Sequence, residues 1–187
     1  MSALNHFLKT TVTSCLAVVM FSIPLAAAEQ ARLDRLFAEL KEAAPEQALV
    51  VAKEIELEWS KSGSAAMDLL LRRGWDALEA GETAHAIEHF TAVTDHAPDF
   101  AEAWHARAVA YTRAQLYGPA IADLERALAL SPRHFNAIYG LGVILEEMGR
   151  PEMAQEAYEA VLDIHPHQTE VQEALKRLAP QLSGQDI

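Results

Sequence analysis

A pattern that returns every 34 residues constrains this chain more than any other feature. Three adjoining windows, Met67–Phe100, Ala101–His134 and Phe135–Gln168, are each 34 residues long and follow one another without a gap. When the windows are aligned, five columns agree in residue type. The columns hold Pro98, Pro132 and Pro166; Ala86, Ala120 and Ala154; Gly74, Ala108 and Gly142; Phe90, Leu124 and Tyr158; and Val93, Ala127 and Val161. Agreement at one fixed period indicates a repeat architecture.

Each window contains two segments with apolar residues at helical spacing. In the middle window these segments run from about Asp99 to Ala114 and from about Gly118 to Leu130. Small residues within both segments allow two helices to cross closely, and the recurrent proline ends the second helix because it has no N–H to donate. Gly81 and Gly149 fall where the first helix ends and a left-handed backbone is favourable. Gln115 holds that column in the middle window, so we expect its turn to be made differently.

At these residues the sequence resembles the tetratricopeptide repeat family. The family pattern is carried by Gly74, Ala86, Phe90 and Pro98 in the first window, by Trp104, Ala108, Tyr111, Ala120, Leu124, Ala127 and Pro132 in the second, and by Leu141, Gly142, Ala154, Tyr158 and Pro166 in the third. The sequence departs from the family where Leu70 replaces the usual Trp, Ala77 the usual Tyr, and Arg73 and Arg107 the usual Leu. The resemblance covers residues 67–168. It implies an all-α fold, an α-solenoid of antiparallel helix pairs stacked as a TPR superhelix.

Helical segments are also expected on both sides of the repeats. Residues 29–63 contain two of them, Gln30–Ala43 and Glu46–Trp59, and lack the recurrent small residue and proline. We interpret this region as a degenerate capping repeat. Residues 168–180 are expected to form a C-terminal capping helix, because a solenoid must cover its last apolar face. Residues 181–187 are expected to be a flexible tail.

The first 28 residues have the three parts of a secretory signal. Lys9 supplies the positive charge, Cys15–Ile23 is a short apolar run, and Leu25-Ala26-Ala27-Ala28 ends in small residues. We therefore expect a cleavable signal peptide over residues 1–28, a periplasmic location, and no stable membrane insertion after cleavage. An uncleaved N-terminal segment that anchors the chain in the membrane is the alternative.

Composition and motifs argue against nucleic-acid binding and catalysis. The net charge of −12 disfavours nucleic acid, which requires clustered Lys and Arg. The sequence has no Gly-rich phosphate loop and no G-x-S-x-G nucleophile motif. We therefore expect no enzymatic activity and no cofactor.

Histidines are the residues that most invite a metal hypothesis. His85 and His89 are one helical turn apart, and His96 could be a third ligand. The glutamate between the first two is not placed as in an H-E-x-x-H motif, so we interpret these histidines as solvent-facing and expect no metal site. Glu102 follows Asp99 by three residues, which is the spacing of a capping box.

The resemblance further implies where a partner would bind. In the family, the first helix of each pair lines the concave face, and its outward residues hold ligand peptides. The corresponding residues here are Leu71, Trp75, Leu78, Glu79, His105, Val109, Thr112, Arg113, Asn136, Tyr139, Val143, Glu146 and Glu147. The family's carboxylate clamp uses Lys, Asn and Arg in columns that here hold Leu71, Trp75, Val109 and Val143. A clamp for acidic C-terminal tails is therefore not expected.

These features together predict a periplasmic protein–protein interaction module, a TPR adaptor or scaffold that serves cell-envelope assembly or secretion. Its partner would be an unidentified protein or peptide segment with apolar anchors and positive charge, held in the concave groove. Trp75 and Tyr139 are the expected aromatic contacts. The alternatives are a structural solenoid that self-associates into a homo-oligomer and a metal-dependent enzyme.

Overall fold

The computed structural model describes residues 27–183, and every regular element in that range is a helix. A first helix spans residues 27–42. The others are α2 (Pro45–Trp59), α3 (Ala65–Glu79), α4 (Thr83–His96), α5 (Ala101–Arg113), α6 (Tyr117–Leu130), α7 (Phe135–Glu147), α8 (Pro151–Ile164) and α9 (Thr169–Ser183). Residues 1–26 of the predicted signal peptide and residues 184–187 of the predicted tail lie outside the described range. Among the described helices, none has the length and apolarity needed to cross a bilayer.

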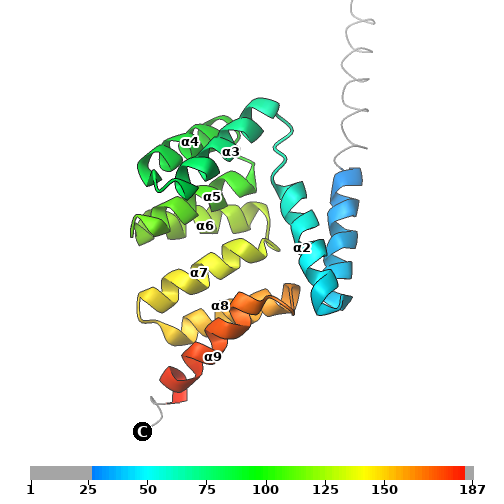
Figure 1. Ribbon diagram of the computed structural model, residues 1–187, viewed down its shortest axis with the longest axis vertical. Coiled ribbons are helices and arrows are strands. Elements are labelled where there is room, and N and C mark those ends of the chain that lie inside the picture. Colours follow the sequence, from blue (N-terminus) through cyan, green and yellow to red (C-terminus); the bar gives the residue numbers. More distant parts are fainter. Residues whose placement is uncertain (1–26, 184–187) are drawn as a thin grey trace, which may run out of the picture.

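The repeats form three antiparallel helix pairs, α3–α4, α5–α6 and α7–α8, which are stacked in sequence order (Figure 1). Because α5 also contacts both α3 and α7, the first helices of the pairs make one layer and the second helices make the other. The expected all-α solenoid is confirmed. The C-terminal helix α9 covers α8 with the buried side chains Val171, Ala174 and Leu178. The predicted tail is wrong for residues 181–183, which continue α9.

Close contact between an aromatic ring and a glycine sets the spacing within a pair. Phe90 and Tyr158 are fully buried, and each ring lies directly over the glycine of the partner helix, Gly74 or Gly142. A Cβ atom at either glycine would overlap that ring. The recurring small residue is therefore needed for the two helices to pack at this distance.

The turn between the two helices of a pair is the same in all three repeats. Gly81, Gln115 and Gly149 all adopt a left-handed backbone, with φ of 80°, 60° and 68°. The expectation of a different turn at Gln115 was wrong. Its N–H donates to the carbonyl of Thr112, and the next N–H donates to the carbonyl of Tyr111, the same pair of bonds that closes the glycine turns. These hydrogen bonds hold a non-glycine residue in a conformation that costs it about 1–2 kcal/mol.

Arg107, which replaces a usual leucine, ties three helices together. Its guanidinium donates to both carboxylate oxygens of Asp123 in α6, at 2.7 and 2.8 Å, and to the Oγ1 of Thr94 in α4 at 2.8 Å. Asp123 and Thr94 are buried. The departure from the family pattern is thus compensated by polar partners on the neighbouring helices.

The first helix and α2, here called the N-terminal hairpin, do not extend the stack onto α3. The hairpin instead packs beside the turns that precede α7 and follow α8, as Figure 1 shows for α2. The ring of Trp59 stacks on His134 with centroids 4.0 Å apart, and Asp34 forms an ion pair with Arg133. Residues 29–63 do form the expected helix pair, but their interpretation as a degenerate capping repeat needs correction, because none of their residues belongs to the core of the first repeat. Leu36, Phe37 and Leu40 share a core with α7 and α8, because Phe135 and Tyr158 offer apolar surface there.

The glycine contacts predict a large effect of a single methyl group. Gly142→Ala should lower the free energy of unfolding by about 1–3 kcal/mol, because the methyl group is forced against the ring of Tyr158. Gly118→Ala is the control, since no atom lies within 4 Å of its Cβ position. It should change stability by less than about 0.5 kcal/mol. Urea unfolding monitored by circular dichroism measures both, and equal effects would contradict the packing described here.

Trp59 should control the stability of the N-terminal hairpin. Trp59→Ala removes a ring that is 8% exposed and contacts Phe37, His134 and Phe135. We expect the local opening free energy of residues 27–59 to fall by about 3 kcal/mol. Hydrogen exchange should then speed up in the hairpin and stay unchanged in α4. Leu57→Ala, at a position 58% exposed in the same helix, is the control. Unchanged exchange of the hairpin in Trp59→Ala would show that it is held elsewhere.

Candidate functional site

A groove of about 520 Å³ lies between α5 and α7, within the layer formed by the first helices of the pairs. It is lined by residues of both helices together with residues of the α5–α6 turn and α6. The lining residues are His105, Ala108, Val109, Thr112, Arg113, Gln115, Tyr117, Leu124, Asn136, Tyr139, Gly140, Val143 and Glu147. The groove is large enough to take several side chains of a bound segment.

The repeat pattern explains the apolar middle of the groove. Val109 and Val143 occupy the same column of successive repeats, so they face the groove from opposite helices. Ala108 and Gly140 also line the groove, and their small size leaves its volume open. The methyl groups of Leu124 are 3.5 Å from the position that a Cβ atom on Gly140 would take. The ring of Tyr139 is half-buried, with its centroid 5.8 Å from that of Tyr158.

Polar contacts occur near both ends of the groove. At one end the side-chain amide of Asn136 donates to Glu56 of α2 at 2.8 Å, so the N-terminal hairpin borders the groove there. At the other end Arg113 donates to the carbonyl oxygen of Leu78 at 2.6 Å. A hydrogen bond to Glu147 raises the pKa of the Tyr117 hydroxyl. The groove therefore has an apolar centre and polar ends.

Most of the residues assigned to a partner site from the sequence come together in this groove. The ones that line it are His105, Val109, Thr112, Arg113, Asn136, Tyr139, Val143 and Glu147. All of them belong to the second and third repeats. The residues assigned in the first repeat, and Glu146, do not line it.

Leu71 and Leu78 were assigned to the exposed face of α3, and this assignment is wrong. Each is 2% exposed and belongs to the core shared by α3, α4 and α5. Ala106 and Ala110 of α5 are members of the same core, and their small side chains leave room for the two leucines to sink between the helices. The leucines therefore cannot contact a partner in this conformation.

The other three residues outside the groove differ from one another. Trp75 is half-buried and meets the ring of Phe90 edge-on, with centroids 5.4 Å apart. Glu79 is exposed near the end of α3. Glu146 accepts two hydrogen bonds from Arg177 of α9, which are the main cause of its lowered pKa, and a third from the hydroxyl of Tyr158. Glu146 therefore links α9 to the third repeat through these hydrogen bonds.

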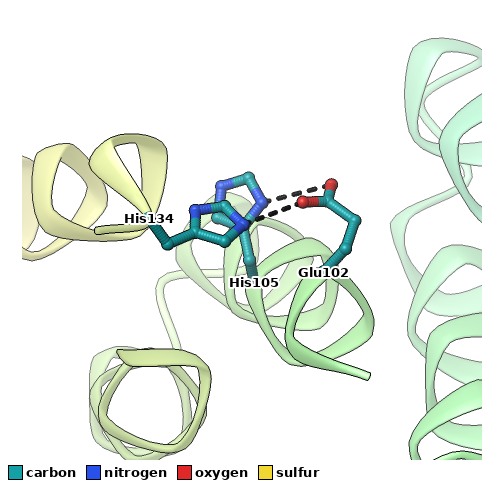
Figure 2. Close-up of side chains that lie close together, drawn as sticks. All are labelled: Glu102, His105 and His134. Atoms are coloured by element: carbon teal, nitrogen blue, oxygen red, sulfur yellow. Dashed lines mark hydrogen bonds and ion pairs between the residues drawn. The ribbon is translucent and has the colours of Figure 1, made fainter. Parts of the chain in front are cut away.

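The side chains of Glu102, His105 and His134 point toward one another and form a cluster (Figure 2), and His105 is also one of the residues that line the groove. Glu102 and His105 are in the first turns of α5, and His134 immediately precedes α7. The Nε2 of His134 is 2.9 Å from one carboxylate oxygen of Glu102, and the Nδ1 of His105 is 3.4 Å from the other. Both histidines are buried. Within residues 27–183 this is the one group of three such side chains whose candidate ligand atoms all lie within 4.8 Å of one another.

Hydrogen bonds define the protonation of this cluster. Burial disfavours the charged form of Glu102. The electrostatic interactions and hydrogen bonds of its carboxylate with the rings of His105 and His134 outweigh burial and lower the pKa of Glu102 to about 2. Burial lowers the pKa of His134, against the opposing hydrogen bond to Glu102. The Nδ1 of His134 accepts from the N–H of Ala137 at 3.2 Å, as the N-cap of α7. The proton of the neutral ring is therefore on Nε2, which donates to Glu102.

The sequence interpretation overlooked this cluster. It treated Glu102 as a capping-box partner of Asp99, whereas α5 has Phe100 at its N-cap and no side-chain cap. The sequence did contain a signal for the cluster. Glu102 and Asn136 occupy the same column of consecutive repeats, and consecutive first helices lie side by side. Glu102 is therefore expected near His134, which precedes Asn136 by two residues. The histidines that were weighed instead lie on α4, where His85 is exposed and contacts Glu82.

Known proteins with the same architecture share sequence with this chain. Two tetratricopeptide repeat models match residues 71–132 and 113–178. A TPR repeat-containing protein of Rhizobium etli is 34% identical in an alignment 201 positions long, which takes in 98% of each chain. Two solved structures carry bound peptides.

One is the first TPR of Spaghetti (RPAP3) bound to the HSP90 peptide SRMEEVD. It is 26% identical with a TM-score of 0.60, and the match covers 63% of this chain and 93% of that one. The other is the second TPR domain of human RPAP3 in complex with the HSP70 peptide SGPTIEEVD. It is 25% identical with a TM-score of 0.54, and the match covers 58% and 90%. The relative from Rhizobium etli and the two matching models show that the present chain belongs to the tetratricopeptide repeat family.

Proposed function

We propose that this protein is an adaptor that binds a segment of a partner protein in the groove between α5 and α7. The observation that carries the proposal is the groove itself, a continuous cavity of about 520 Å³ between consecutive first helices. Val109, Tyr139 and Val143 give it an apolar centre that can take the side chains of an extended or helical segment. The non-enzymatic role expected from the sequence is part of this proposal.

The chemistry of the groove favours a partner with apolar anchors and basic flanks. Apolar side chains would fill the centre, where burial contributes most of the binding free energy. Glu147 at one end and Glu56 beside the other would attract positive charge, as would the net charge of −12 of the chain. Basic flanks would thus raise the rate of association more than the final affinity.

This ligand class differs from the acidic peptides bound by the two RPAP3 domains. Of the residues that line the groove, Arg113 alone carries a permanent positive charge, and its Nη1 is already held by the carbonyl oxygen of Leu78. The columns that hold the clamp residues in the family contain Val109 and Val143 here, and Leu71 is buried. Two valines offer nothing to a terminal carboxylate.

We further propose that the protein acts after export, in the periplasm, and serves cell-envelope assembly or secretion. Support comes from the basic, apolar and small-residue parts of residues 1–28. A signal that is not cleaved would keep the same module at the membrane surface. In either case the groove would be presented to envelope proteins.

Blocking the groove tests the proposal. Val143→Arg places a long charged side chain in the apolar centre. We expect an envelope protein that is captured by the wild-type protein to be lost by Val143→Arg, with at least about 100-fold weaker binding by calorimetry once that protein is purified. Tyr139→Ala should weaken binding by about 10-fold to 30-fold.

Met153→Arg is the matched control, because Met153 is 47% exposed on α8, outside the groove. It should bind like the wild type. Capture that survives Val143→Arg would contradict the groove assignment. A solution mass that shows a dimer, with capture lost only when the dimer is broken, would favour the self-associating solenoid instead.

A further inference from the structure

We propose that Glu102, His105 and His134 form a binding site for a divalent transition-metal ion of the zinc class. The donor set is one carboxylate and two imidazoles, which suits Zn²⁺, Ni²⁺ or Cu²⁺ and does not suit Mg²⁺ or Ca²⁺, since those prefer oxygen ligands throughout. The site borders the peptide groove through His105 and is distinct from the α4 histidines. It replaces the sequence-based expectation that the protein holds no metal.

The separations of the three donors are close to those of a tetrahedral site. Zn²⁺ binds nitrogen and carboxylate oxygen at about 2.0–2.2 Å, so two ligand atoms at corners of the tetrahedron are about 3.4 Å apart. The Oε2 of Glu102 lies 2.9 Å from the Nε2 of His134, and the other carboxylate oxygen, Oε1, lies 3.4 Å from the Nδ1 of His105. With one ligand atom taken from each residue, all three atoms lie within 4.8 Å of one another. Small side-chain rotations therefore suffice to bring all three donors to one ion.

The cluster is also held in place before any ion arrives. The ring of His134 is completely buried and stacks on Trp59 of the N-terminal hairpin, with an interplanar angle of 10°. Glu102 and His105 are one helical turn apart, at i and i+3 on α5. Supporting contacts of this kind orient metal ligands and raise affinity. Trp59 and His134, which are more than 70 residues apart in the sequence, thus both contribute to this site.

Binding an ion requires a tautomer change in His134. Its Nε2 now carries the proton, so coordination through Nε2 moves that proton to Nδ1, through solvent, and the ring stays neutral. The N–H of Ala137 then loses Nδ1 as an acceptor. That N–H also donates to the carbonyl oxygen of His134 at 2.9 Å, so it keeps a partner. The new Nδ1–H faces this N–H as a second donor, so the metal–ligand bonds must offset both that contact and the loss of the cap.

An ion can reach the cluster from the groove. His105 lines the groove, and the side chains of His105 and Glu102 are 10% and 13% exposed, whereas that of His134 is fully buried. The three protein donors leave one tetrahedral position open on that accessible side. Water or another donor molecule would complete the coordination.

Titration of the full chain, without an affinity tag, with Zn²⁺ and Co²⁺ tests the site. We expect one ion per chain, and the visible absorption of bound Co²⁺ should have the intensity of a four-coordinate site. His105→Ala and Glu102→Gln should lower Zn²⁺ affinity by about 100-fold and 10-fold or more. Mg²⁺ should not compete. These two variants are preferred because His134 also caps α7 and contacts Trp59, so its replacement could unfold the hairpin.

The double variant His85→Ala/His89→Ala is the matched control, because it removes two histidines from α4 and leaves the cluster intact. It should bind Zn²⁺ like the wild type. In the wild type, ¹⁵N NMR should show the proton of His134 moving to Nδ1 and a shift of the Ala137 amide. Absence of binding, binding lost in the α4 variant, or an unperturbed His134 ring at saturation would each overturn the proposal.

Discussion

The stack depends on the absence of side-chain bulk where two helices of a pair cross. Phe90 and Tyr158 occupy the space that a Cβ atom on Gly74 or Gly142 would need. That contact brings the helices of a pair together, and the repetition of the small-residue column orients every pair alike. Consecutive first helices then lie in one layer, and the groove between α5 and α7 follows from their spacing.

The N-terminal hairpin adds a feature that the repeats alone do not contain. By packing beside the turn between α6 and α7, it borders the groove through Glu56 and holds His134 through Trp59. The groove and the Glu102 cluster therefore share one wall. Trp59 contacts both His134 and Phe135, so the docking of the hairpin and the position of His134 depend on the same ring.

The repeat columns made the helix pairs, their order and most of the groove predictable, since these depend on contacts that recur at one period. Features that depend on a single unrepeated contact were not predictable. Trp59 and His134 are far apart in sequence and meet once, so no pattern marks the docking of the hairpin. Leu71 and Leu78 occupy the same repeat columns as the groove residues His105 and Thr112. They are nevertheless buried in the core, because the small side chains of Ala106 and Ala110 leave room for them there. Family columns alone do not reveal such local differences in neighbouring side-chain size.

The central claim is that a partner segment occupies the space between α5 and α7. Chemical-shift mapping of the isotope-labelled protein with a purified partner segment tests it most directly. We expect the shifts to change in Val109, Thr112, Tyr139 and Val143 and to stay constant along the outer faces of α4, α6 and α8. Changes confined to those outer faces, or to the exposed Leu49, Val50 and Leu57 of α2, would contradict the claim.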